Sequence, residues 1–366
     1  MILPASYSPD WIREKRKTYP KSDPSIIEKV IYALTLVEQL AQTDLSFTFK
    51  GGTSLLLILP EPKRFSIDVD IVTTETREKI ENVLAEICTK DVFSKIELDE
   101  FRSYKPGIPK AHYLLTFFSQ LDKKERVILL DVLYEEHGYP ALVNAPIVNE
   151  WIQTDENLFT VQIPSTDSIT GDKLTAFAPN TVGIRFRVEH ADGSITEKQM
   201  EVMKQLFDLG ILFDKIGNLT HFKQSFEKTA QKEIAYRAEQ NISSDAILDD
   251  IINTSLMIGS LGKFFDPNGA YLHVATGLKQ LKSYIYNGTF RSDEAVLASA
   301  KAAYLAAMTL TGYEGEIQRW QDGDDILKYM IAPIEYQFLN KRRNIPGGPL
   351  FYWYHTLGLL GKIKIS

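Results

Sequence analysis

A Gly-Gly turn between two apolar runs constrains this chain more than any other feature. Gly51 and Gly52 follow an apolar, β-favouring run, and a second apolar run begins at Leu55. This pattern predicts a strand that turns into a short helix, with glycines that let an anion approach the backbone closely. The first amides of a helix bind phosphate, and Thr53 and Ser54 add hydroxyl donors. The turn is therefore a candidate phosphate site, although a tight turn with a helix cap has the same residues.

An acidic segment follows the turn. Residues 65–72 alternate as a strand does, with apolar side chains on one face and Ser66, Asp68 and Asp70 on the other. Two like charges on one strand face repel each other unless a cation lies between them. Carboxylate oxygens are hard ligands, which suit Mg²⁺ or Mn²⁺. The segment therefore predicts a metal site, and the alternative is a sheet edge that holds its acids in solvent.

Asp131 is the best candidate for a third carboxylate. It lies in the run 126–133, which is so apolar that it predicts a buried central strand. An acid in such a strand needs a cation or a hydrogen bond. Two metal ions about 3.5–4 Å apart also need more negative charge than two aspartates supply. We therefore expect Asp131 to join the acidic pair, unless it simply lies near solvent at a strand end.

Two later helices carry further candidates. A helix that begins near Thr166 is predicted to keep Lys173 off its apolar face, where it is either an exposed lysine or a compact charge for phosphate. Lys204 and Asp208 lie four residues apart on a predicted helix over 197–212, so they share a face. They are either part of a nucleotide site or a surface ion pair.

The segments 50–55, 64–70, 171–177 and 204–209 together resemble the DNA polymerase beta-like nucleotidyltransferase superfamily. Within it, they resemble the AbiEii/AbiGii toxin-like nucleotidyltransferases. The resemblance covers residues 25–215 and does not extend over the C-terminal part. The chain departs from the family pattern at Gln205, where the family commonly has an acidic residue.

The resemblance implies two groups of site residues. The catalytic group is Asp68, Asp70, Asp131, Lys173 and Asp208, and its first three members are the metal ligands. The nucleotide-binding group is Lys50, Gly51, Gly52, Thr53, Ser54, Arg64, Ser66 and Lys204.

The implied reaction is Mg²⁺-dependent transfer of a nucleotidyl group from an NTP to an acceptor hydroxyl, with loss of pyrophosphate. The family adds the expectation of a toxin in a toxin–antitoxin or abortive-infection system. Its acceptor would be tRNA or another RNA, and a cognate antitoxin would neutralise it. Two alternatives stay open. One is a non-toxic nucleotidyltransferase with a small-molecule acceptor, and the other is a catalytically silent nucleotide-binding module.

Composition sets broad limits. The chain has 366 residues, of which 44% are hydrophobic and 24% are charged, as in an ordinary globular protein. The net charge of −7 argues against a whole surface devoted to nucleic acid, while a local basic patch stays compatible with it. Cys88 is the one cysteine, so no internal disulfide is expected, and no segment predicts a membrane helix. These features favour a cytoplasmic protein that binds no membrane.

The predicted elements define an α+β fold. Helices are expected at 24–41 and 75–90, and after residue 214 helical patterns take over. Strands near 47–49, 65–72, 96–98, 113–118, 127–133 and 159–163 are expected to form a mixed sheet flanked by helices. The family resemblance makes this the polymerase beta-like nucleotidyltransferase sheet. We expect a catalytic domain over 1–213 and a helical C-terminal domain over 214–366.

Overall fold

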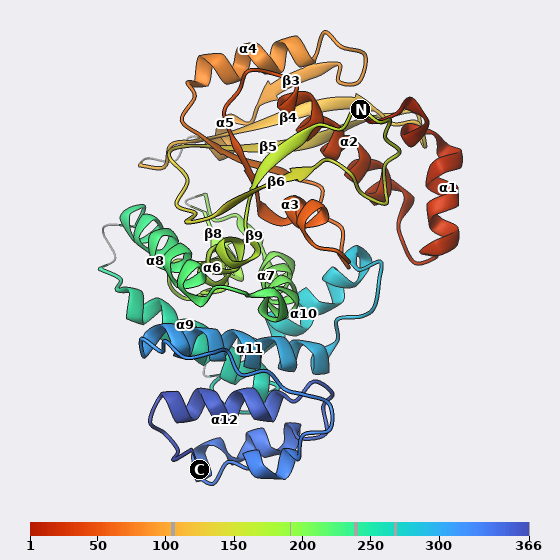
Figure 1. Cartoon of the computed structure of the whole chain (residues 1–366). Helices are drawn as coiled ribbons and strands as arrows, with labels where there is room; N and C mark the ends of the chain where they lie inside the picture. The colour runs from red at the N-terminus through yellow and green to blue at the C-terminus, as the bar shows by residue number, and fades with distance from the viewer. Residues whose placement is uncertain (104–106, 191, 238–240, 267–268, 366) are drawn as a thin grey trace. The chain divides into compact units, whose positions relative to one another are not determined.

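The computed structural model describes residues 1–103, 107–190, 192–237, 241–266 and 269–365. The chain divides into two compact units. The first unit is Met1–Ser165 with Ser283–Gly288, and the second is Thr166–Lys282 with Thr289–Ser366. Figure 1 labels most of the helices and strands of both units.

A five-stranded mixed sheet forms the centre of the first unit. Its strands lie in the order β1 (Thr48–Lys50), β2 (Val69–Thr73), β5 (Glu125–Tyr134), β4 (Lys110–Phe118) and β3 (Lys95–Leu98). The β2–β5 pair is parallel, and the other neighbouring pairs are antiparallel. The fold class expected from the sequence, a mixed sheet flanked by helices, is confirmed.

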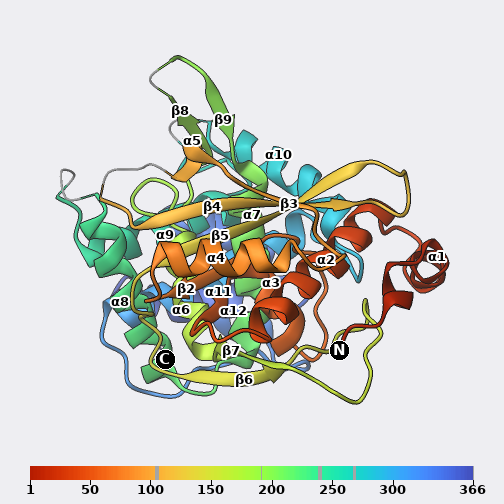
Figure 2. The ribbon, with the colours of Figure 1, turned by 90° about the horizontal axis from the view of Figure 1, so that it is seen from above.

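The helices of the first unit surround this sheet. They are α1 (Pro9–Thr18), α2 (Pro24–Ala41), α3 (Gly51–Ile58), α4 (Arg77–Ile87) and α5 (Glu100–Ser103), with a 3₁₀ helix at Pro4–Tyr7. Figures 1 and 2 show that α4 covers one face of the sheet. Its apolar side chains, including Ile80 and Leu84, are buried in the core.

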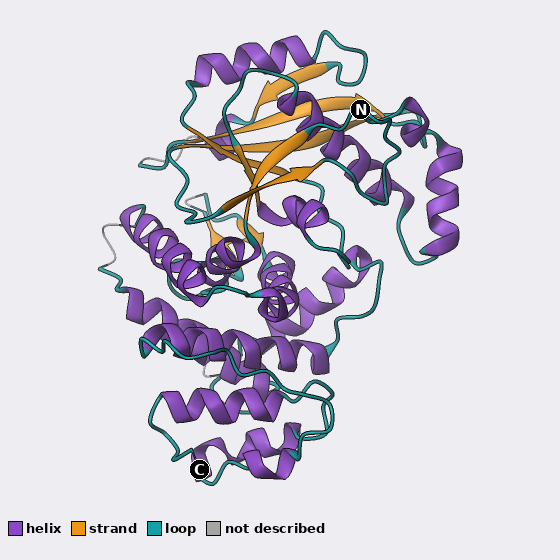
Figure 3. Ribbon diagram, in the orientation of Figure 1, coloured by secondary structure: helices purple, strands orange, loops and turns teal. Residues whose placement is uncertain are grey.

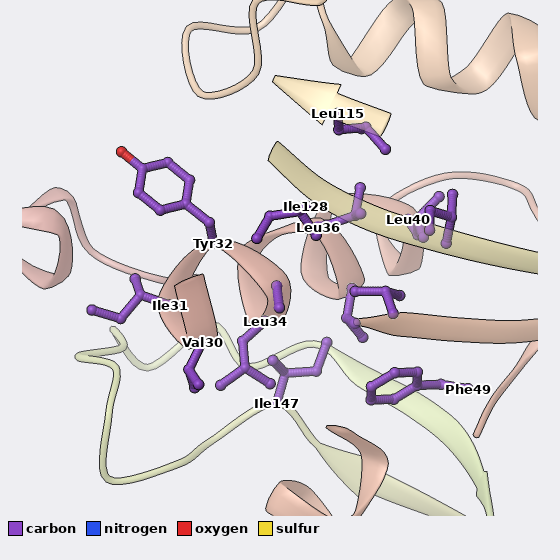
Figure 4. Packing of buried hydrophobic residues seen from close by; sticks show 14 of the residues in the cluster. Val30, Ile31, Tyr32, Leu34, Leu36, Leu40, Phe49, Leu115, Ile128 and Ile147 are labelled. Atoms are coloured by element: carbon purple, nitrogen blue, oxygen red, sulfur yellow. The ribbon is translucent and has the colours of Figure 1, made fainter. Parts of the chain in front are cut away.

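Helix α2 is buried on nearly every side, so it organises the core of this unit. Asp23 caps its N-terminus by accepting a hydrogen bond from the Ser25 amide, and Pro24 occupies its first turn. Figure 4 shows its side chains between Leu115 and Ile128 of the sheet and Ile147 on the other side. The expected bounds of this helix, 24–41, are confirmed.

Two strand expectations need correction. The acidic strand starts at Val69 rather than at residue 65, so Asp68 comes just before β2. The strand expected at 159–163 does not join the main sheet. It is β7 (Thr160–Pro164), which pairs with β6 (Leu142–Pro146) in a separate two-stranded sheet. Strand β6 was not predicted, because pairing with a distant segment defines it.

The second unit is mainly helical, with one short hairpin of β8 (Arg187–Glu189) and β9 (Ile195–Glu197) (Figure 3). Its helices are α6 (Thr166–Ala176), α7 (Gln199–Leu212), α8 (Leu219–Ala235), α9 (Ser244–Ser260), α10 (Tyr271–Leu281), α11 (Ser292–Leu310) and α12 (Pro349–Leu359). Shorter 3₁₀ helices lie at Phe213–Lys215, Ile326–Tyr329 and Ile334–Arg342, and a further one, Lys282–Tyr284, spans the boundary between the two units.

Helix α11 is the centre of the second unit. It packs against α7, α9 and α12, and most of its residues are buried. Many of them are alanines, such as Ala298, whose small side chains let neighbouring helices approach closely. At its start the Glu294 carboxylate accepts a hydrogen bond from the Arg291 amide.

The expected domain boundary at 213/214 lies inside the second unit, within the 3₁₀ helix Phe213–Lys215. Helices α6 and α7 belong to this unit, whereas all strands of the main sheet belong to the first. The division into functional domains stays a prediction. Among the described residues, no helix is both long and apolar enough to span a bilayer.

Candidate active site

The Gly-Gly turn lies where the sequence predicts it, between β1 and α3. Lys50 ends β1 and is the N-cap of α3, and its side chain does not cap the helix amides. The Thr53 hydroxyl donates a hydrogen bond to the Asp68 carbonyl oxygen at 2.5 Å, and the Ser54 hydroxyl donates one to the Gly51 carbonyl oxygen at 2.9 Å. Both hydroxyls thus fasten the turn internally, and the first amides of α3 form the candidate phosphate site.

The two glycines allow the acidic segment to pack against the start of α3. Gly51 has a φ of +76°, and a Cβ atom at this position would lie 2.1 Å from Asp70 Oδ2. A Cβ atom on Gly52 would lie 2.7 Å from Ser66 Oγ and 2.8 Å from Arg64 Nη2. The structure therefore gathers three predicted site residues around the Gly-Gly turn. Any larger residue at either glycine would displace them.

Arg64 is a buried member of this group, with an exposed fraction of 6%. Its Nη1 donates a hydrogen bond to the Phe65 carbonyl oxygen at 2.9 Å. Its backbone forms an isolated bridge with Ile285, in the short segment that returns to the first unit. A buried guanidinium fixed in this way is already oriented, so it can contact a phosphate without losing much side-chain freedom.

Strand pairing brings Asp70 and Asp131 together. The two residues are register partners on the parallel strands β2 and β5, so their side chains leave the same face of the sheet. Asp68 lies two residues before Asp70, at the entry to β2. The expected meeting of Asp131 with the acidic pair is therefore supported at the level of the backbone register.

Asp131 is held by two side chains that the sequence reasoning did not include. His112 Nδ1 hydrogen-bonds Asp131 Oδ1, and Arg102 Nη2 lies 3.8 Å from Oδ2. Over the described ranges, no set of three or more His, Cys, Asp or Glu side chains is arranged to hold a metal ion. The sequence offered one signal for this contact, a histidine within the apolar strand 110–118. The sequence could not identify the partner of that histidine, because strand register decides it.

Lys173 and Asp208 form a buried ion pair in the second unit. Lys173 Nζ lies 2.7 Å from Asp208 Oδ2, and the two side chains are 5% and 2% exposed. Nζ also donates a hydrogen bond to Gln205 Oε1 at 3.3 Å. The expectation that Lys173 lies off the core face is wrong, because α6 also packs against α7, where Lys173 contacts Gln205 and Asp208.

Asp208 does not belong to a surface ion pair, because it is almost fully buried. Lys204, one turn earlier on α7, is only half-buried. The basic and acidic residues of this motif thus differ in burial. Gln205, at the position where the chain departs from the family pattern, contacts the amino group of Lys173.

The first unit thus combines a mixed sheet with a Gly-Gly turn that packs against an acidic strand. Residues 35–265 match the family described as nucleotidyl transferase AbiEii toxin, of a type IV toxin–antitoxin system. The match covers more than half of the chain, so the protein belongs to the AbiEii nucleotidyltransferase family. This confirms the family resemblance seen in the sequence motifs.

Two solved structures are similar to the chain. One is JHP933 from Helicobacter pylori, with 17% identity, a TM-score of 0.42, and coverage of 78% of this chain and 91% of that one. The other is a candidate nucleotidyltransferase of H. pylori, with 17% identity, a TM-score of 0.42, and coverage of 79% of this chain and 97% of that one. No protein of curated function matches the chain.

Proposed function

We propose that this protein transfers a nucleoside monophosphate from an NTP to a hydroxyl group of an RNA, with tRNA as the first acceptor class to test. It would act as the toxin of a toxin–antitoxin or abortive-infection pair, with a cognate antitoxin as partner. Its membership of a toxin nucleotidyltransferase family supports the class of reaction. The acceptor and the cation are part of the proposal.

One observation carries the chemistry, the packing of Asp70 against Gly51 at the start of α3. The first amides of a helix attract phosphate. A carboxylate at the same place repels phosphate unless a cation lies between them. The contact is therefore expected in a site that binds a nucleotide together with a metal ion.

The donor set fits a hard divalent cation, Mg²⁺ or Mn²⁺. Asp68, Asp70 and Asp131 would hold it, since carboxylate oxygens are the ligands these ions prefer. In the described part of the chain these three side chains do not already form a ligand cluster, so cation binding would draw their carboxylates closer together. A bound cation would neutralise charge on the phosphates and lower the pKa of the acceptor hydroxyl.

The other residues have roles in binding and orienting the nucleotide. The amides from Gly51 to Ser54 would hold the β- and γ-phosphates, and Arg64 would orient them. The other members of this phosphate-binding group are Lys50, Ser66 and Lys204. Lys173 would neutralise charge on the leaving pyrophosphate, and Asp208 would orient Lys173. The roles of Lys173, Lys204 and Asp208 rest on the family motif.

The test is a transfer assay. The protein is incubated with Mg²⁺, each α-labelled NTP in turn, and total tRNA. We expect label to move to RNA with one preferred NTP, and the variant Asp68→Ala/Asp70→Ala to transfer none. Asp10→Ala is the matched control, because it removes an aspartate that is 86% exposed in the same unit. Transfer that survives in the double variant would contradict the assigned chemistry.

The alternatives give different results in the same assay. Label that moves only to small molecules of a cell extract would identify a non-RNA acceptor. NTP binding without transfer to any acceptor would identify a silent module. Growth arrest on expression, abolished by Asp68→Ala, would support the toxin role, and release of the arrest by co-expression of a neighbouring gene would support an antitoxin.

A further inference from the structure

His112 has a single side-chain hydrogen bond in the described part of the chain, and that bond goes to Asp131. The two residues are register partners on the antiparallel strands β4 and β5. The His112 side chain is 7% exposed, and its backbone amide donates a hydrogen bond to Ser103 Oγ at 2.8 Å. The sheet and Ser103 thus fix the backbone of His112, and burial restricts its imidazole ring.

The hydrogen bond has a defined direction. A carboxylate oxygen accepts, so Nδ1–H is the donor. Nε2 is buried and has no hydrogen-bond partner among the described residues. A buried polar atom without a partner costs free energy, and the fold retains it at this position. The imidazole is therefore placed for its one contact, with Asp131 Oδ1.

The other carboxylate oxygen of Asp131, Oδ2, has only a weak interaction with a neighbouring side chain. Oδ2 lies 3.8 Å from Arg102 Nη2, and the Arg102 side chain is 45% exposed. At this distance the contact is an ion pair between partly solvated groups, which is weak. His112 thus holds Oδ1 firmly, while Oδ2 is the oxygen that a cation can take over.

We propose that His112 is a positioning residue that fixes the orientation of Asp131, so that Oδ2 is presented to the divalent cation and Oδ1 is not. This inference rests on the proposed function, because it needs Asp131 to be a metal ligand. Side chains that orient a ligating carboxylate raise metal affinity and are sensitive to substitution.

Two substitutions separate the hydrogen bond from the packing. His112→Phe keeps a ring of similar size and removes the donor. His112→Asn keeps an amide N–H the same number of bonds from Cα as Nδ1, and so restores the donor. Mn²⁺ binding is measured by the electron paramagnetic resonance of the free ion, without any turnover. Unfolding in EDTA reports whether each variant is folded.

We expect His112→Phe to weaken Mn²⁺ binding about 10- to 100-fold and His112→Asn to bind nearly as the wild type does. In the transfer assay, His112→Phe should raise the Mn²⁺ concentration needed for half-maximal rate, with the KM for NTP unchanged at saturating metal. In an Asp131→Asn background, His112→Phe should have no further effect on Mn²⁺ binding. His137→Phe, at an exposed histidine of the same unit, is the control.

Several outcomes would overturn the inference. Wild-type affinity for Mn²⁺ in a folded His112→Phe would do so, and so would equal losses in His112→Phe and His112→Asn. An undiminished effect in the Asp131→Asn background would show that His112 does not act through Asp131. If the wild type transfers nucleotides and these losses are absent, only this inference fails. If the wild type neither binds Mn²⁺ nor transfers nucleotides, the proposed function fails as well.

Discussion

Breaking the buried ion pair of the second unit should destabilise it strongly. Lys173 and Asp208 approach to 2.7 Å, and neither side chain is more than 5% exposed. At an effective dielectric constant of about 20, unit charges at this distance attract each other by about 6 kcal/mol. Lys173→Met removes this attraction and deprives the buried Asp208 carboxylate of the Lys173 ammonium group. We expect a loss of about 3–5 kcal/mol in the free energy of unfolding.

Replacing both partners should recover much of that loss. The variant Lys173→Met/Asp208→Leu buries no stranded charge, and apolar pairs of similar volume are often as stable as the ion pair they replace. It should therefore be more stable than either single variant. Its nucleotide transfer should stay low, since the proposed role of Lys173 in catalysis needs the positive charge.

A second pair in the same unit supplies the control. Lys301 Nζ lies 2.7 Å from Asp214 Oδ2, the same distance, but the Asp214 side chain is 50% exposed. Water can solvate Asp214 after Lys301→Met, so the loss should be clearly smaller than for Lys173→Met.

Hydrogen exchange of peptides from α6 and α7 at increasing urea is the appropriate measurement, because a chain with two units need not unfold in one step. A loss below about 1 kcal/mol for Lys173→Met would refute the reasoning from stranded charge. A double variant that is less stable than both single variants would refute it as well.

Two further predictions concern the first unit. Gly51→Ala should cost about 1–2 kcal/mol from its left-handed backbone alone, and it should abolish transfer by displacing Asp70. Gly52→Ala meets side-chain atoms of Ser66 and Arg64 but has no left-handed backbone and gains helix propensity, so urea unfolding should show a smaller loss. An equal loss for both variants would contradict this. Tyr19 donates a hydrogen bond to the Glu150 carboxylate at 2.5 Å. The pKa of Tyr19 is raised to about 12, mainly by burial and to a lesser extent by the neighbouring Glu150. The pKa of Tyr19 in the unfolded chain is about 10, so the contribution of this residue to stability is complete below pH 10 and is lost as the pH rises through about 12. The difference in tyrosinate absorbance between the wild type and Tyr19→Phe should show this ionisation. A transition near pH 10 would refute the prediction.

Several elements of the fold were predictable because their signals are local. The helix Pro24–Ala41 has a capping aspartate, a proline in its first turn and a periodic apolar face, all within one segment. The Gly-Gly turn into α3 also has its signal in adjacent residues. The acidic strand was expected four residues too early, because alternation continues through residues that have no pairing partner in the main sheet.

Other elements depend on distant partners and were missed. Strand β6 and the hairpin of β8 and β9 are short, and each is defined by its pairing. The isolated return of residues 283–288 to the first unit has no sequence signal at all. Secondary structure of this kind exists only once the rest of the unit has formed around it.

The sequence by itself determined the residue types of the site and their local spacing. The order of residues along the chain places Gly51, Gly52 and Asp70 in recognisable motifs, and these motifs indicate the family. Tertiary structure decided which of these residues meet. Strand register paired Asp131 with His112, and helix packing buried Lys173 beside Asp208. The reason is that burial and hydrogen bonding are properties of neighbours in space, whereas periodicity and caps are properties of neighbours in sequence.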